Sequence, residues 1–104
     1  MINNIAQDQR LPPSLSPVDF EQLPEKPGVY YFRNPDKKVV YVGKAINIKK
    51  RVASHFNGQI ITPQRQNFLR DIHFISFKIC ATEFMGLLLE CTEIKKLWPI
   101  YNKV

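Results

Sequence analysis

The sequence predicts an α+β fold in which a small, mostly antiparallel three-stranded sheet is flanked by helices in the order ββααβα. Two β-branched and aromatic runs lie on either side of a proline-containing turn, two capped helical segments follow, and a third alternating run precedes a last helix. The 104 residues, 44% of them hydrophobic, suffice for one modest core but not for two independent domains.

The chain is expected to consist of a leader followed by one domain. Five of the eight prolines lie within the first 27 residues, where they interrupt any periodic pattern. We interpret residues 1–23 as a proline-rich leader or linker and residues 24–104 as the folded domain. A semi-extended arm of this composition suits a tethered module, and a merely frayed terminus is the alternative.

The first predicted element is a β-hairpin. Residues 29–32 and 39–42 are rich in valine and aromatic side chains and flank an Asn-Pro-Asp-Lys turn at 34–37. If the turn is of type I, Tyr30 lies directly opposite Tyr41, and the two phenols share one face of the sheet. A bulge at the last residue of the turn would shift this register by one.

Capping residues and periodicity predict the next three elements. Asn47 is a suitable N-cap for a helix over residues 48–56, which has apolar side chains at intervals of four on its buried side and is expected to end at Gly58. Thr62, followed by a proline, begins a second helix that runs to residue 71. Residues 73–80 alternate in polarity, as expected of a third strand lying on the core.

The last helix combines an apolar side with an oddly placed carboxylate. Thr82 caps this helix, which is predicted to run to about Leu97. Its apolar side, which we expect to face the core, consists of Phe84, Leu87, Leu88, Cys91, Ile94 and Trp98. Glu90 lies at the edge of this side, whereas Glu93 points to the solvated side. A carboxylate at a core edge requires a cation, a metal or a hydrogen-bond donor, and a structural ion pair would serve equally.

The charge distribution favours a polyanionic partner. The chain carries 15 Lys and Arg against 9 Asp and Glu, a net charge of +6, and eight of the cations lie between Lys37 and Arg70 without a single acidic residue. This segregation predicts a positive surface patch suited to nucleic acid, and a solvated basic face without a partner is the alternative.

No stretch approaches the ~20 apolar residues of a membrane span, and no secretion signal is present at the N-terminus. We therefore expect a cytoplasmic protein without a membrane partner. Cys80 and Cys91 fit no disulfide framework, and their spacing from the two histidines matches no zinc pattern. Both cysteines are expected to be reduced core residues.

Several polar side chains are candidates for chemistry. Arg51 and His55, four residues apart, lie on the flank of the buried stripe of the first helix. The planar fork of Arg51 suits a phosphate as well as a structural salt bridge, and His55 suits proton transfer as well as packing. Tyr30 and Tyr41 are ordinary strand packing residues unless nearby cations such as Lys44 favour a role in proton transfer.

Five ordered blocks then match a known pattern. They are Pro27-Gly28-Val29-Tyr30, Tyr41-Val42-Gly43-Lys44-Ala45, Asn47-Ile48-Lys49-Lys50-Arg51, Leu87-Leu88-Leu89-Glu90 and Pro99-Ile100-Tyr101-Asn102. Over roughly residues 24–103 the chain resembles a GIY-YIG endonuclease domain. The likeness is closest to the UvrC-type N-terminal nuclease domain and to GIY-YIG modules fused to exonucleases of the DNA polymerase III epsilon type. Valine replaces the isoleucine of the first motif.

The resemblance implies divalent-metal-dependent hydrolysis of a DNA phosphodiester bond in DNA repair or processing. It places Tyr30 and Tyr41 beside the scissile phosphate, one of them acting as general base on a water or relaying its proton, with Lys44 tuning or contacting the pair. Arg51 would stabilise charge developing on the phosphoryl oxygens, and Glu90 would ligate a single Mg²⁺ or Mn²⁺ ion.

The resemblance also implies supporting residues and partners. Asn102 would complete the site, and His55 occupies a position that varies within such domains. DNA backbone contacts are expected from five cations, Lys44, Lys49, Lys50, Arg65 and Arg70. Beyond DNA, the expected partners are other repair or polymerase-associated proteins or a fused exonuclease domain.

Two other classes of function are also compatible with the sequence. A non-catalytic DNA-binding or repair-partner docking module on the same fold predicts binding without turnover. A protein-interaction domain in which Glu90 and Arg51 form a structural ion pair predicts that removing the Glu90 charge destabilises the fold and that metal does not raise the melting temperature.

Overall fold

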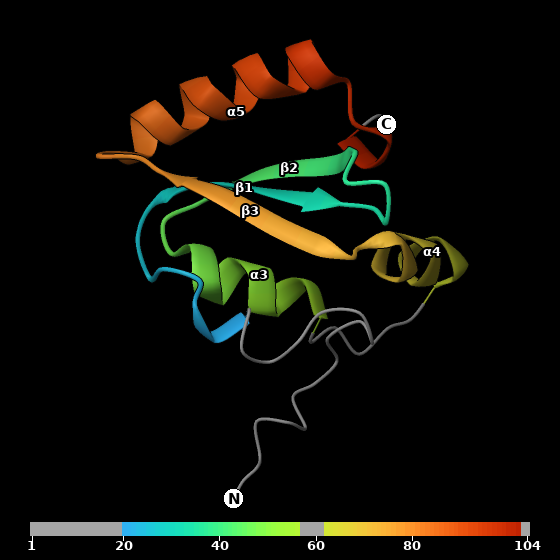
Figure 1. Cartoon of the computed structure of the whole chain (residues 1–104). Helices are drawn as coiled ribbons and strands as arrows, with labels where there is room; N and C mark the ends of the chain where they lie inside the picture. Colours follow the sequence, from blue (N-terminus) through green and yellow to red (C-terminus); the bar gives the residue numbers. More distant parts are fainter. Residues whose placement is uncertain (1–19, 57–61, 103–104) are drawn as a thin grey trace, which may run out of the picture.

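The structure is a computed structural model that describes residues 20–56 and 62–102 (Figure 1). Most of the predicted leader, up to residue 19, and the predicted helix stop at Gly58 lie outside the described residues. Leu23 is buried in the core, and Phe20 packs partly against it. None of the described helices is long and apolar enough to cross a membrane.

The sheet has three antiparallel strands, as predicted. β1 (Gly28–Arg33) is the central strand, with β2 (Val39–Ala45) on one side and β3 (Phe74–Ile79) on the other. β1 is covered on both faces, which explains its uninterrupted run of valine and aromatic residues. The outer edge of β2 carries the backbone groups that the site uses.

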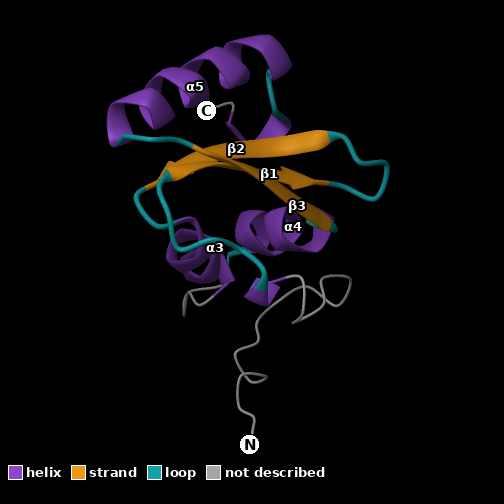
Figure 2. Cartoon of the chain, turned by 60° about the vertical axis from the view of Figure 1, so that its left-hand side comes forward, coloured by secondary structure: helices purple, strands orange, loops and turns teal. Residues whose placement is uncertain are grey.

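Helices cover both faces of the sheet. α3 (Ile48–Phe56) and α4 (Pro63–Asp71) lie on one face, and α5 (Glu83–Leu97) lies on the other (Figures 1 and 2). A short 3₁₀ helix, η1 (Ile100–Asn102), follows α5 and lies against β2. The predicted α+β class and the order ββααβα are confirmed.

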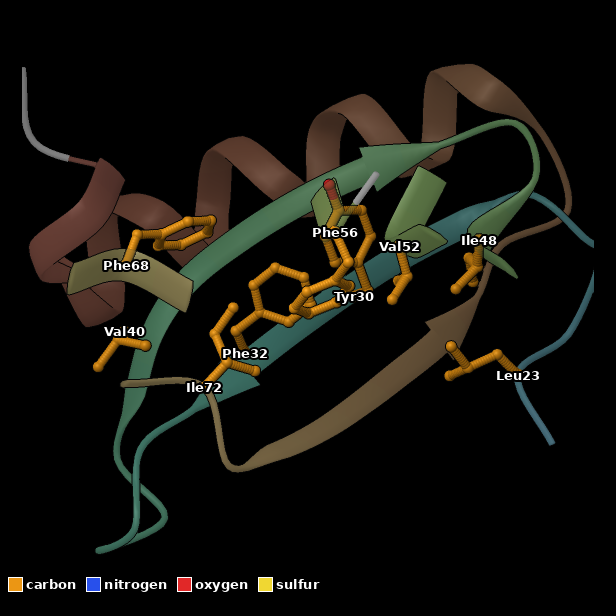
Figure 3. Packing of buried hydrophobic residues seen from close by; sticks show 9 residues of the cluster. All are labelled: Leu23, Tyr30, Phe32, Val40, Ile48, Val52, Phe56, Phe68 and Ile72. Carbon is orange, nitrogen blue, oxygen red and sulfur yellow. The ribbon is translucent and has the colours of Figure 1, made fainter. Parts of the chain in front are cut away.

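The core is divided by the sheet into two layers. Alternation along β1 sends Tyr30 and Phe32 to the face covered by α3 and α4, where they pack in the hydrophobic core cluster of Figure 3. Val29 and Tyr31 point to the other face, where Leu89 of α5 packs against them. The larger, aromatic layer therefore lies on the side that carries Arg51 and His55.

The hairpin turn has the predicted hydrogen bond but one additional residue. Lys37 N donates to Asn34 O over 2.8 Å, as expected of a type I turn. Lys37 then adopts a left-handed conformation with φ of 65°, and Asn34 N donates to Lys38 O over 3.0 Å. The turn is therefore followed by a bulge, which shifts the strands by one residue.

A second irregularity corrects the predicted register further. Between Phe32 and Arg33 the pairing slips by another residue, so that Phe32 pairs with Tyr41 and Tyr30 pairs with Gly43. The predicted pairing of Tyr30 with Tyr41 is therefore wrong by two residues. Because side chains alternate with a period of two, the two tyrosines still share one face of the sheet.

The orientation of α5 also differs from the prediction. Glu93 was expected in solvent but is only 9% exposed, because Tyr31 Oη donates to its carboxylate over 2.8 Å and Lys78 Nζ lies 3.8 Å from it. Phe84 and Leu88, expected in the core, are 65% and 50% exposed. Because these two partners compensate the charge of the Glu93 carboxylate, α5 can bury this side chain.

The cysteines depart from expectation in the same region. Both are free thiols, but Cys91 is exposed on α5 and Cys80 is only half-buried beside the layer formed by Val29 and Tyr31. Neither is therefore a fully buried core residue. For Cys91 the cause is the rotation of α5 that exposes its apolar side.

Candidate active site

Tyr30 is the centre of a buried polar cluster. Its side chain is fully buried, and its hydroxyl lies 2.7 Å from Nε2 of His55. Burial, followed by the charges of Arg65 and Arg51, lowers the pKa of His55 to about 4. The imidazole is therefore neutral at pH 7, the form that accepts the phenol proton when its own proton resides on Nδ1.

Two further groups surround the same phenol. Burial and, next, the neighbouring Tyr41 raise the pKa of Tyr30 above its usual range, while hydrogen bonding and charge from Arg51 act in the opposite direction. Burial prevails, so Tyr30 remains a phenol. The rings of Tyr30 and Tyr41 lie 6.2 Å apart between centroids, and the Tyr41 ring meets that of His55 edge-on at 5.4 Å.

Local sequence explains how α3 presents these groups. Ile48, Val52 and Phe56 are buried at intervals of four against the sheet, as predicted. Arg51 and His55 precede two of these residues by one position each and therefore project along the flank of the buried stripe towards β1 and β2. The structure brings Arg51, His55 and the two tyrosines together on this flank.

Gly43 is a steric requirement of the cluster. It pairs with Tyr30 across the hairpin, and the Tyr30 ring lies directly over it. A Cβ atom at position 43 would lie 2.4 Å from the Tyr30 hydroxyl oxygen, closer than real Cβ atoms approach other heavy atoms. The glycine of the Tyr-Val-Gly block therefore makes room for the phenol of the first block.

Glu90 and Asn102 occupy the free edge of β2. Backbone groups at Val42 and Lys44 point away from β1 because alternate residues of an edge strand are unpaired. Lys44 N donates to Glu90 Oε2 over 3.1 Å, while Val42 N donates to Asn102 Oδ1 over 2.7 Å and Asn102 Nδ2 donates to Val42 O over 2.9 Å. Both side chains thereby fix the strand that carries Tyr41 and Gly43.

Cationic side chains gather around a cleft beside this edge. The cleft has a volume of about 440 Å³, and its lining includes Lys44, Lys50 and Arg51. Ser54 of α3 adds a hydroxyl, and Glu83 contributes an acidic side chain to the lining. A cleft with three cations can accept a phosphate group and neutralise its charge.

The remaining predicted DNA contacts are distributed differently. Lys49 is held by an ion pair with Glu21 at 3.0 Å, away from the cationic cleft. Arg70 lies on α4, where it contacts Asn67 within the same helix. Arg65 lines a second cleft. The structure therefore groups Lys44 and Lys50 with the candidate site and separates the other three cations from that cleft.

The second cleft contains residues that the sequence analysis did not assign to a site. It measures about 340 Å³ and is lined by Tyr41, His55, Arg65, Phe68 and Tyr101, with polar residues from the start of α4. Phe68 of α4 was not identified from the sequence as a site residue, and Tyr101 was identified only as the neighbour of Asn102 in the last block. That adjacency was the one available signal.

The residues present fit a cation held through a single carboxylate. Among the described residues, no group of three or more His, Cys, Asp or Glu side chains could form a metal cage. Glu90 presents a half-buried carboxylate of which one oxygen is oriented by Lys44 N. Magnesium commonly binds through one or two carboxylates and completes its shell with waters and substrate phosphate, so one glutamate is sufficient.

The fold and the site define a GIY-YIG domain, and the family of UvrC-like GIY-YIG domains matches residues 26–103. The chain belongs to this family, and the resemblance inferred from the five blocks is confirmed. Among curated relatives, UvrABC system protein C of Methanosarcina barkeri is 42% identical over 85 residues, covering 82% of this chain and 16% of the relative. The corresponding protein of Flavobacterium psychrophilum is also 42% identical over 85 residues, covering 82% of this chain and 14% of the relative.

Solved structures agree with this assignment. The GIY-YIG N-terminal endonuclease domain of UvrC from Thermotoga maritima, bound to magnesium as its catalytic divalent cation, superposes with a TM-score of 0.67 at 26% identity, covering 96% of this chain and 98% of that one. A point mutant of the same domain bound to its catalytic divalent cation gives a TM-score of 0.69 at 26% identity, covering 99% of this chain and 100% of that one. The chain spans about 16% or less of the length of the curated relatives quoted above.

Proposed function

We propose that this domain is a divalent-metal-dependent endonuclease that hydrolyses a DNA phosphodiester bond in DNA repair or processing. The observation that carries the proposal is the Tyr30 phenol, held between His55 and Arg51 next to a cationic cleft. Phosphodiester hydrolysis requires a route for the proton of the attacking water and positive charge at the phosphate, and this cluster supplies both.

The tyrosines are proposed to act in series. Tyr41 is half-buried and borders a cleft, so it is the phenol that reaches the attacking water, whereas Tyr30 is fully buried behind it. As the water attacks phosphorus, one of its protons passes to Tyr41, the Tyr41 proton passes to Tyr30, and the Tyr30 proton passes to Nε2 of neutral His55. Phosphate bound near Arg51 would offset the cationic charge and raise the pKa of His55.

The charged residues are proposed to hold the phosphate and the metal. Arg51, Lys44 and Lys50 neutralise the phosphoryl oxygens, which gain charge as the bond to the leaving oxygen breaks. Glu90 would hold Mg²⁺ or Mn²⁺, which when bound would supply Lewis-acid polarisation of the phosphate. Asn102 acts as a positioning residue, because its amide is engaged by both backbone groups of Val42.

The test is a plasmid nicking assay with and without Mg²⁺, using wild type, Glu90→Gln and the matched control Glu25→Gln. Glu25 is exposed and belongs to neither cleft. Loss of the metal ligand should lower the rate on the order of 10³-fold with DNA binding retained, whereas Glu25→Gln should cut like wild type. Equal nicking by wild type and Glu90→Gln would contradict the assignment.

The alternatives are separated by the same experiment. A non-catalytic docking module would bind DNA through Lys44 and Lys50 and cut no substrate in Mg²⁺ or Mn²⁺. The structural ion pair considered from sequence is absent, since Glu90 and Arg51, both described residues, form no salt bridge with each other. Glu90 receives its compensation from Lys44 N instead.

We further propose that the module acts within a larger assembly of repair or polymerase-associated proteins. The support is its similarity to UvrABC system proteins C, whose name makes them components of a larger system. Co-purification of the complete native protein with its partners, followed by identification of the bound chains, tests this point. Recovery of only a free, active single chain would contradict it.

A further inference from the structure

The second cleft is built mainly from aromatic rings and borders the candidate active site. Its lining shares Tyr41 and His55 with the tyrosine cluster and adds Phe68 and Tyr101. Neither of these added rings has a part in the proposed hydrolysis. A volume of about 340 Å³ lies within the range of pockets that hold small organic groups.

The rings form a floor with two walls. Phe68 is buried at the centre, and the ring of Tyr41 meets it at a centroid distance of 5.4 Å with planes inclined by 73°. The ring of Tyr101 meets the same Phe68 at 5.0 Å with an inclination of 66°. Both tyrosines are half-exposed, so their outer ring surfaces remain available to a planar ligand.

The walls are held in place before any ligand binds. The Tyr101 hydroxyl donates to the carboxylate of Asp71, which fastens η1 to the end of α4. Arg65 donates to the backbone oxygen of His55, and its guanidinium carbon lies 5.6 Å from the centroid of the Phe68 ring. Because these side chains are already ordered, less conformational entropy is lost on binding.

The chemistry of this cleft suits a nucleobase. Aromatic rings stack on any base, and a guanidinium plane adds a cation that attracts both the π face of the base and the phosphate attached to it. A purely apolar ligand would derive no benefit from Arg65. The cleft also opens beside Tyr41, the phenol that the proposed function assigns to the attacking water.

We propose that this aromatic cleft, formed by Tyr41, Phe68 and Tyr101 with Arg65, binds one unpaired nucleobase of the DNA substrate next to the scissile phosphate. The inference rests on the proposed nuclease function, because it assigns a substrate class to the same site. Since a base that is mismatched, bulged or single-stranded is removed from the stack at least cost, such DNA is the preferred substrate.

The test compares two duplexes in EDTA, where binding is measured without cleavage. One contains a single-nucleotide bulge, and the other contains the same bulge with an abasic site, so the two backbones are identical. Wild type should bind the base-containing bulge roughly tenfold more tightly. Tyr101→Ala should abolish this preference, whereas Tyr101→Phe, which keeps the ring, should retain it.

Equal affinity of wild type for the two bulges would overturn the proposal, as would an undiminished preference in Tyr101→Ala or a lost preference in Tyr101→Phe. If Tyr101→Ala unfolds below the assay temperature, the affinities of wild type for the two bulges alone decide whether the proposal holds. Plasmid nicking is measured separately. If the protein nicks plasmid but shows no preference for the base-containing bulge, only the proposed role of the cleft is overturned. If it shows that preference but does not nick plasmid, the role of the cleft is supported and the nuclease function is overturned.

Discussion

At the scale of single residues, the two sequence blocks that contain Tyr30 and Gly43 form one steric unit. The phenol occupies the space where a side chain at position 43 would begin, and it can do so only because that residue is glycine. Sequence periodicity placed Tyr30 and Tyr41 on one face but could not reveal this contact. Two bulges had to be located first, and bulges depend on backbone conformations that the sequence encodes weakly.

Gly43→Ala should therefore destabilise the domain by about 1–3 kcal/mol, because the buried Tyr30 ring has no room to move. Gly86→Ala on α5 is the matched control, since a Cβ there would meet only Gly28 O at an ordinary 3.7 Å. The control should be neutral or slightly stabilising because alanine favours a helix. Denaturant unfolding measures the free energy of unfolding of both variants. Similar losses of stability in the two would refute the steric explanation.

His55 should give the domain a defined dependence of stability on pH. Its pKa is about 4 in the fold against 6.5 ordinarily, so between these values the unfolded chain binds more protons than the native one. The free energy of unfolding should rise from pH 4 to about pH 6.5 and then level off, with a His55 contribution on the order of 3 kcal/mol. Urea melts of wild type and His55→Gln measure the difference.

His73→Gln serves as the control for this pH dependence, because His73 lies directly before β3 and outside the tyrosine cluster. It should keep the wild-type pH profile, whereas His55→Gln should flatten it. An unchanged profile in His55→Gln would show that the imidazole is not held neutral by its surroundings.

At the scale of elements, features that depend on neighbouring residues could be predicted from the sequence, whereas features that depend on contacts between distant residues could not. Asn47, Thr62 and Thr82 marked helix starts because a cap is a contact between neighbouring residues. The buried side of α5 could not be predicted from its apolar side. Glu93 is buried because Tyr31 and Lys78 lie opposite it, and neither partner is close in sequence.

The corrected orientation of α5 predicts two unequal mutational effects. Leu88→Ser should change the free energy of unfolding by no more than about 0.5 kcal/mol, because Leu88 is already half exposed. Glu93→Ala should cost about 1–3 kcal/mol, since it leaves the buried Tyr31 hydroxyl without its acceptor. Thermal or denaturant unfolding compares them. A larger loss for Leu88→Ser would restore the orientation predicted from sequence.

At the scale of the whole molecule, the site residues lie on one face of the sheet and along the free edge of β2. The face under α3 and α4 holds the tyrosines, Arg51 and His55, and the free edge of β2 receives Glu90 and Asn102 from the other side. The fold class and element order followed from the sequence because they require only periodicity and connection lengths. The aromatic cleft did not, because it joins Tyr101 to residues of α3 and α4.

The serial arrangement of the tyrosines is the central claim, and a single-turnover cleavage rate with saturating DNA and Mg²⁺ tests it most directly. Tyr41→Phe should lower that rate by about 10²- to 10⁴-fold, because it removes the hydroxyl of a cleft-lining residue that is proposed to accept the water proton. The ring remains, so DNA affinity and melting temperature should stay at wild-type values. A Tyr41→Phe variant that cleaves at the wild-type rate would contradict the account.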